Sequence, residues 1–164
     1  MHTRALQPRH GPVLFVRPLR NGDVATVNAV FERLGERSRR ARFHGPKPRL
    51  GVADLEHLAG VDSTRHVLVA HVRGDPRPVA LARLVRDGQA AEIAFEVADE
   101  YQQRGIGSAL TAVLLADARA AGITEITALV ASDNPAALAL LRRILNRLEI
   151  RFEGPELSIR AALT

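Results

Sequence analysis

The stretch Gln102-Gln103-Arg104-Gly105-Ile106-Gly107 decides the fold, because a strand-like segment leads into it and a helix-like segment follows it. Residues 91–97 are apolar enough for a buried strand, and residues 99–103 form a polar turn. The two glycines lack a Cβ, so phosphate oxygens can approach the main chain. The stretch predicts a phosphate-binding turn with a helix dipole behind it. The expected helix covers residues 108–121, and its apolar side chains share one face: Leu110, Val113, Leu114, Ala118 and Ala121.

Downstream of this helix the pattern continues with a strand and a second helix. Gly122 ends the first helix, and residues 125–130 read as a strand that a helical crossover places parallel to residues 91–97. Asn134-Pro135 begins the next helix, because proline is favoured at the first helical position. Residues 149–163 predict one or two final strands around Gly154-Pro155.

Upstream, short helices alternate with hairpin-connected strands. A strand at residues 13–16 precedes a helix whose apolar stripe runs from Val24 to Leu34 and which Gly35 ends. Further helices are expected over residues 37–42 and 53–59, and strands at 67–72 and 79–85. A two-residue hairpin turn at Asp87-Gly88 leads into the strand that precedes the glycines. The fold class is therefore α/β (α+β), a mixed and mostly antiparallel central sheet with one βαβ unit and flanking helices.

Composition limits the classes of function. The 164 residues predict one domain over residues 12–164 behind a loose tail at residues 1–11. No run of about 18 apolar residues occurs, so we expect no membrane segment and a cytoplasmic protein. Cysteine is absent, which excludes thiol nucleophiles and thiolate metal sites, and the histidines lack metal-ligand spacing. We therefore expect no metal.

The formal charge of +5 does not by itself predict a nucleic-acid partner. Aromatic residues make up only 4% of the chain, so few side chains could stack on bases. The positive charge is nearly all arginine and is scattered, with one dense group at Arg37, Arg39, Arg40 and Arg42. A solvated basic face, or contacts to an anionic cofactor, is the preferred interpretation.

The glycine turn is open to two other interpretations. Gly105-x-Gly107 after a strand also opens the dinucleotide-binding fingerprint, but Leu110 occupies the third glycine position and the chain has only one βαβ unit. In a purely structural interpretation the glycines would only end a strand. Neither alternative accounts for the downstream motif at Asn134.

Three motifs in order resemble the core of the GNAT superfamily of acetyl-coenzyme A dependent N-acetyltransferases. They are Ala91-Glu92-Ile93-Ala94-Phe95, Gln102-x-x-Gly105-x-Gly107 and Asn134-x-x-Ala137-x-x-Leu140. The resemblance covers almost the whole chain. Ser38-Arg39-x-x-Arg42-Phe43 is additionally similar to a stretch in the catalytic domains of actinobacterial protein lysine acetyltransferases.

The resemblance implies acetyl-coenzyme A as the co-substrate. Backbone N–H groups of the turn would then cradle its pyrophosphate, Arg104 would add charge, and main-chain groups near Phe95 and Val97 would pair with the pantetheine arm. Asn134 either contacts this arm or only caps its helix. The cofactor-binding residues implied are Phe95, Val97, Gln102, Gln103, Arg104, Gly105, Ile106, Gly107, Ser108 and Asn134.

The chemistry requires a base, because a lysine-type amine with a pKa of about 10.4 must lose a proton before it attacks a thioester. Glu92 matches the glutamate that serves as base in histone-type and protein-lysine members of the family. Glu92 and Glu96 share one face of a strand, where each would raise the pKa of the other, and Glu96 is expected to help or to orient the substrate. Many members have a tyrosine acid where this chain has Leu141, and Tyr101 is a poor substitute. The sulfur can leave as thiolate.

We therefore predict an N-acetyltransferase that acts on a primary amine, either a small molecule or a protein lysine, as a monomer or homodimer. Carboxylates near the site favour a cationic acceptor, and the arginine group favours an acidic surface or a carboxylate-bearing metabolite. A degenerate domain that binds acetyl-coenzyme A as a sensor or interaction module is the alternative, because the tyrosine is absent.

Overall fold

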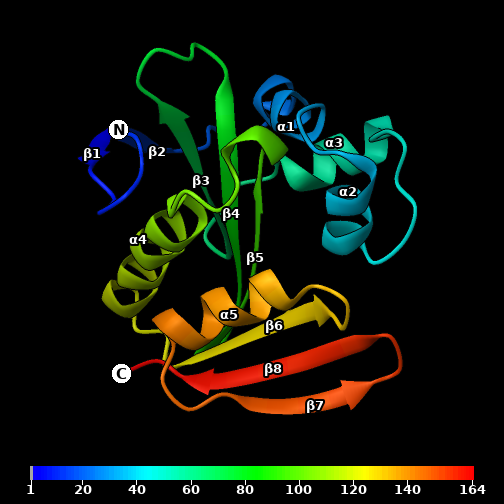
Figure 1. Ribbon diagram of the computed structural model, residues 1–164. Coiled ribbons are helices and arrows are strands. Elements are labelled where there is room, and N and C mark those ends of the chain that lie inside the picture. The colour runs from blue at the N-terminus through cyan, green and yellow to red at the C-terminus, as the bar shows by residue number, and fades with distance from the viewer. Residues whose placement is uncertain (1) are drawn as a thin grey trace.

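An eight-stranded sheet with the strand order β1-β2-β3-β4-β5-β6-β8-β7 forms the centre of the protein. The computed structural model describes residues 2–164 (Figure 1). The strands are β1 (Arg4–Leu6), β2 (Leu14–Pro18), β3 (Arg65–Val72), β4 (Pro78–Asp87), β5 (Ala90–Val97), β6 (Glu125–Ala131), β7 (Glu149–Glu153) and β8 (Glu156–Ala162). The helices are α1 (Val24–Phe31), α2 (Glu36–Phe43), α3 (Val52–Leu58), the 3-10 helix η1 (Asp99–Tyr101), α4 (Ile106–Ala120) and α5 (Pro135–Ile144).

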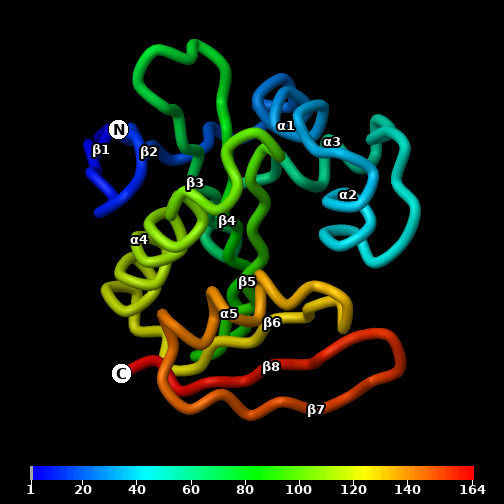
Figure 2. The backbone as a smooth tube through the Cα atoms, in the orientation of Figure 1, coloured from blue at the N-terminus to red at the C-terminus, as the bar shows by residue number. Residues whose placement is uncertain are grey.

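Helices cover both faces of the sheet and divide the core in two. The tube in Figure 2 shows α1, α2 and α3 grouped away from α4 and α5. Along β4, Ala80 and Ala82 belong to the core beneath α4 and α5, whereas Leu81 belongs to the core beneath α1 and α3. Residues 79–84 are consequently all buried, as expected for a strand covered on both faces.

Strands β5 and β6 are the only parallel neighbours in the described part of the chain, and they diverge. Their register contains only Ala90–Glu125, Ala91–Ile126 and Glu92–Thr127. Beyond Glu92 the upper part of β5 pairs with β4 alone. The predicted βαβ unit is confirmed. Its two parallel strands separate after Glu92, along the half of β5 that leads to the glycine turn.

Most predicted elements occur within a few residues of their expected bounds. α1 ends at Phe31 rather than Leu34, and Gly35 is the N-cap of α2 instead of the end of α1. The β4–β5 turn consists of Gly88-Gln89, one residue later than predicted, because Asp87 still pairs with Ala90. The closing segment forms two strands, and β8 lies between β6 and β7.

The N-terminal segment differs from the expected loose tail. Residues Arg4–Leu6 form β1, which pairs antiparallel with β2, so that prediction is wrong for these residues. Arg4 Nη2 also lies 2.9 Å from Asp117 Oδ1 on α4. Met1 lies outside the described residues. Among residues 2–164, no helix is long and apolar enough to cross a membrane.

Candidate functional site

The turn before α4 has the backbone geometry of an anion site. Gly105, the residue before the first helical one, has a φ of 79°, and Gln103 has a φ of 60°. Within residues 2–164 the N–H groups of residues 103–108 donate no hydrogen bond, and the first intrahelical bond runs from Ala109 N to Gly105 O. Several donors at the positive end of the α4 dipole therefore remain available to one ligand.

Gly107 allows three elements to meet at this turn. A Cβ at this position would lie 3.1 Å from Leu140 Cδ1 on α5 and 3.4 Å from Val97 Cγ2 on β5. The first distance is shorter than an ordinary carbon–carbon contact, and the second is at the lower limit of one. The absence of a Cβ at Gly107 therefore lets α5 and β5 pack closely against the first turn of α4.

Ser108 connects the first turn of α4 to α5. Its hydroxyl accepts a hydrogen bond from Arg143 Nη2 at 3.1 Å. Arg143 therefore places an exposed positive charge beside the turn. Sequence reasoning did not single out Arg143, because its position depends on how α4 and α5 pack.

The upper half of β5 has main-chain groups on its β6 side that pair with no other strand. Ala98 N–H donates to Val79 O at 2.8 Å, and the β4–β5 register is unbroken from Val97 to Ala90. Hydrogen-bonded and non-hydrogen-bonded pairs alternate in an antiparallel ladder. Phe95 and Val97 therefore direct their N–H and C=O groups away from β4, into the opening left by β6. An extended ligand could pair there as an added strand.

The side chain of Gln102 forms hydrogen bonds with three segments next to the glycine turn. Its Nε2 donates to Val97 O at 3.0 Å, to Ser38 Oγ at 3.0 Å and to Asp99 Oδ1 at 3.2 Å. Ser38 Oγ in turn donates to Asp99 Oδ1 at 2.7 Å. The side-chain amide of Gln102 thus holds α2, β5 and η1 together, and its main-chain N–H donates to Asp99 O at 3.3 Å.

Asn134 acts as the N-cap of α5, with Oδ1 accepting from Ala137 N at 3.2 Å. One of the two predicted roles, helix capping, is therefore present. Leu141, at the position of the family tyrosine, is fully buried in the core beneath α4 and α5. Its side chain contributes to the core and has no proton to donate to a leaving group.

Glu92 and Glu96 project from the same face of β5 into different surroundings. Glu92 is exposed at the point where β5 and β6 separate. The side chain of Glu96 is only 7% exposed, and its Oε2 lies 3.2 Å from Arg42 Nε, an ion pair without hydrogen-bond geometry. Burial raises the pKa of Glu96, although Arg42 and Arg83 oppose the shift. Glu92 and Glu96 lie on the same face of the strand, as predicted. The raised pKa of Glu96, however, comes from burial rather than from the charge of Glu92.

The space beside Glu96 is too small for an acceptor. It is a cavity of about 10 Å³ between Arg42, Arg83 and apolar side chains, which is room for about one water molecule. Arg83 Nη2 donates to Leu58 O, and burial lowers the pKa of Arg83 to about 10. A larger hollow of about 390 Å³, next to His66 and Asp117, lies at the opposite end of α4 from the glycine turn.

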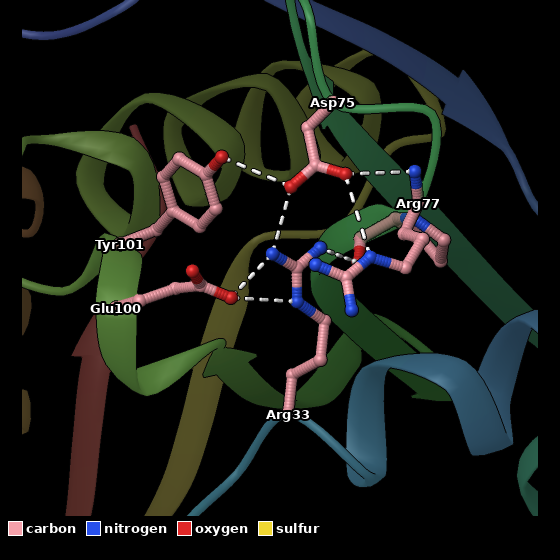
Figure 3. A network of polar contacts seen from close by, with 6 residues as sticks. Arg33, Asp75, Arg77, Glu100 and Tyr101 are labelled. Atoms are coloured by element: carbon pink, nitrogen blue, oxygen red, sulfur yellow. Dashed lines mark hydrogen bonds and ion pairs between the residues drawn. The ribbon is translucent and has the colours of Figure 1, made fainter.

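A network around Arg33 connects the end of α1 to the segment that enters the glycine turn (Figure 3). Arg33 has a side chain only 6% exposed, and its Nη2 donates to Asp75 Oδ2 at 2.7 Å. Its Nε donates to Glu100 Oε1 at 3.0 Å. Tyr101 Oη donates to Asp75 Oδ2 at 3.0 Å, which raises the pKa of Tyr101. Tyr101 is therefore held as a donor inside this network and is no candidate for the catalytic acid.

The network predicts a pH-dependent loss of stability. The Arg33 hydrogen bond, with those from Arg77 N and Tyr101 Oη, holds the pKa of Asp75 well below its usual range. This carboxylate therefore stabilises the fold above its unfolded pKa of about 3.9, and the stabilisation is lost as pH falls below that value. Asp75→Asn should lower the free energy of unfolding by about 2 kcal/mol at pH 7, with a smaller difference from the native chain at pH 3.

Urea unfolding at both pH values measures this effect, and Asp87→Asn is the matched control. Asp87 is exposed at the end of β4, where its side chain makes no hydrogen bond or ion pair within residues 2–164. An Asp75→Asn difference that stayed constant between the two pH values would contradict the assignment.

No group of three or more histidine, aspartate or glutamate side chains among residues 2–164 is arranged to hold a metal ion. The described site consists of a main-chain anion cradle, an open strand edge and carboxylates on the neighbouring face.

Comparison with known proteins agrees with this geometry. Residues 30–146 match the model of the acetyltransferase (GNAT) family. The chain is 38% identical over 148 residues to acetyltransferase Pat of Mycolicibacterium smegmatis, covering 87% of this chain but only 43% of that protein. Its structure is similar to the crystal structure of the GNAT domain of S. lividans PAT, with a TM-score of 0.88, 26% identity and coverage of 98% and 97% of the two chains.

A third relative is a cAMP-binding acyltransferase from Mycobacterium smegmatis, with a TM-score of 0.70 and 29% identity. The alignment covers 99% of this chain and 48% of that one. The chain thus spans less than half the length of two of these relatives. With the matched family model and the same fold over nearly its whole length, the chain belongs to the GNAT family of acetyltransferases.

Proposed function

We propose that the protein transfers an acetyl group from acetyl-coenzyme A to a primary amine, with a protein lysine as the acceptor class. The observation that carries the proposal is the meeting of two sets of main-chain groups that form no hydrogen bond with another main-chain group. One set is the N–H groups of residues 103–108, and the other is the β6-facing edge of β5 at Phe95 and Val97. A ligand with a diphosphate at one end and an amide-containing arm at the other matches both sets.

The cofactor-binding roles follow from this match. The N–H groups of the turn would hold the diphosphate, with Arg104 and the newly identified Arg143 supplying positive charge. Phe95 and Val97 would pair with the arm. This arrangement would bring the thioester to the face of the sheet on which Glu92 lies.

Direct attack requires a neutral amine. Glu92 accepts one proton from the acceptor ammonium, the nitrogen forms a bond to the thioester carbonyl carbon, and the carbon–sulfur bond then breaks. The nitrogen releases its remaining excess proton to solvent, and the sulfur leaves as thiolate with a pKa of about 8.5. No side-chain acid is required, which agrees with the burial of Leu141.

Glu96 is proposed to position rather than to react. Its side chain is buried and pairs with Arg42, so it would hold α2 against β5 behind the strand face that carries Glu92.

Protein lysine is favoured over small amines by the likeness to acetyltransferase Pat and by the Ser38-Arg39-x-x-Arg42-Phe43 stretch. Ser38 and Arg42 contact Gln102 and Glu96 respectively, so this stretch joins the turn to the carboxylates.

Calorimetric titration tests cofactor binding first, with an expected dissociation constant in the range of about 1–100 μM that is common for co-substrates. Release of free thiol then tests turnover against a panel of lysine peptides, polyamines and amino acids. Absence of acetyl-coenzyme A binding would contradict the proposed function. Binding without turnover on any amine would favour the sensor or interaction module instead.

A further inference from the structure

Helix α2 carries four arginines in eight residues and has no buried residue. Its arginines divide into two pairs. Arg39 and Arg42 contact the rest of the protein, whereas Arg37 and Arg40 are exposed.

The inner pair attaches the helix to the domain. Arg39 donates to Pro48 O at 2.8 Å and lies over the ring of Phe31 at 4.2 Å. Arg42 pairs with Glu96 at 3.2 Å. The inner pair therefore has a structural explanation within the chain.

The outer pair, Arg37 and Arg40, has no such structural explanation. Within residues 2–164 the side chains of Arg37 and Arg40 make no hydrogen bond and no ion pair, and Glu36 is the only acid in the helix. Residues three apart are neighbours on one helix face, so the two like charges destabilise α2 slightly. A partner with negative charge would offset this repulsion.

The position of α2 relates the outer pair to the acceptor side. The helix contacts β5 and β6, and Arg42 joins it to Glu96 on the face of β5 that also carries Glu92. Figure 1 shows α2 above the β7–β8 hairpin. Ser38 fixes it to Asp99, and His44 Nδ1, at its C-terminal end, lies 3.2 Å from Glu156 Oε1 on β8. The outer arginines are therefore exposed on a helix whose inner side reaches Glu96 on β5 through Arg42.

We infer that Arg37 and Arg40 bind an acidic surface of the protein that carries the acceptor lysine. The inference rests on the proposed function and specifies its substrate class. A small carboxylate-bearing metabolite at Glu92 would not span the helix to its outer face, whereas a folded protein or a peptide could contact both. Exposed charges of this kind contribute chiefly to the rate of encounter and to specificity.

The experiment compares two lysine peptides that differ only in their flanks, aspartate and glutamate in one and asparagine and glutamine in the other. Arg37→Glu/Arg40→Glu is compared with Arg20→Glu/Arg73→Glu, which makes the same change in net charge. Arg20 and Arg73 are exposed, lie outside α2 and make no side-chain hydrogen bond or ion pair among residues 2–164.

The α2 variant should raise KM for the acidic peptide roughly tenfold at low salt, and added salt should reduce the difference. KM for the neutral peptide and for acetyl-coenzyme A should stay within about twofold, and the control variant should behave as the native chain. Circular dichroism checks folding, and Arg37→Gln/Arg40→Gln removes the charges without adding acids.

Fluorescence anisotropy of the labelled peptides separates the two levels of the proposal, because it needs no turnover. Loss of acidic-peptide binding in both α2 variants, but not in the control, supports the inference. Equal binding of acidic and neutral peptides by the native chain would overturn it. Absence of turnover with every amine would contradict the proposed function, while the anisotropy result would still decide the role of α2.

Discussion

Replacing Glu92 by glutamine should lower kcat about 100- to 1000-fold at pH 7, with the affinity for acetyl-coenzyme A unchanged. Glutamine keeps the shape of the side chain but cannot accept the proton of the ammonium, and general bases contribute about this much to rate. Because Glu92 is exposed where β5 and β6 part, the substitution removes no buried contact. The loss should therefore appear in turnover and not in stability.

The pH profile distinguishes a base from a binding residue. As pH rises toward the amine pKa of about 10.4, more acceptor is already neutral, so the deficit of Glu92→Gln should shrink. Glu153→Gln, which changes an exposed glutamate on β7, is the matched control and should keep the native rate. A Glu92→Gln chain with full kcat near pH 7 would remove Glu92 as the base.

Replacing Gly107 by valine should weaken acetyl-coenzyme A binding by roughly 100-fold. The new Cβ would already lie 3.1 Å from Leu140 Cδ1 and 3.4 Å from Val97 Cγ2, and the two further methyl groups have no space between α5 and β5. Overpacking of this kind costs about 1–3 kcal/mol and displaces backbone. The displaced backbone is the first turn of α4, which carries the free N–H groups.

Gly45→Val is the matched control for Gly107. No atom lies within 4 Å of a Cβ built at Gly45, and its φ is not in the left-handed region. Calorimetric titration of both variants with acetyl-coenzyme A measures the effect. Equal affinities for the two variants would show that the packing at Gly107 does not support the binding turn.

Local patterns predicted the elements of the site well. The glycine spacing predicted the turn, because positive φ at Gly105 and close packing at Gly107 are properties of the backbone that only glycine supplies. The alternation of β5 placed Glu92 and Glu96 on one face, and Asn134-Pro135 marked the start of α5. These features depend on neighbours in the chain, so a single sequence contains them.

The partners of the site residues were not predictable in this way. Arg42 reaches Glu96 across 54 positions of the sequence, and Arg143 reaches Ser108 across 35 positions. The dense arginine group read as one basic patch, yet the structure divides it into two inward and two outward side chains. Helix α2 has no apolar stripe to orient it, so no periodicity could have shown which arginines face the sheet.

By itself the sequence determined the order of most strands and helices, the glycine turn before α4 and the shared strand face of Glu92 and Glu96, because each follows from short-range periodicity and backbone preference. Only the tertiary structure decided three further points. β6 separates from β5 after Glu92, Glu96 is buried while Glu92 is exposed, and the N-terminal residues form β1 rather than a tail. Each of these depends on which distant segments pack together, and the free energy of such contacts is distributed over side chains far apart in the chain.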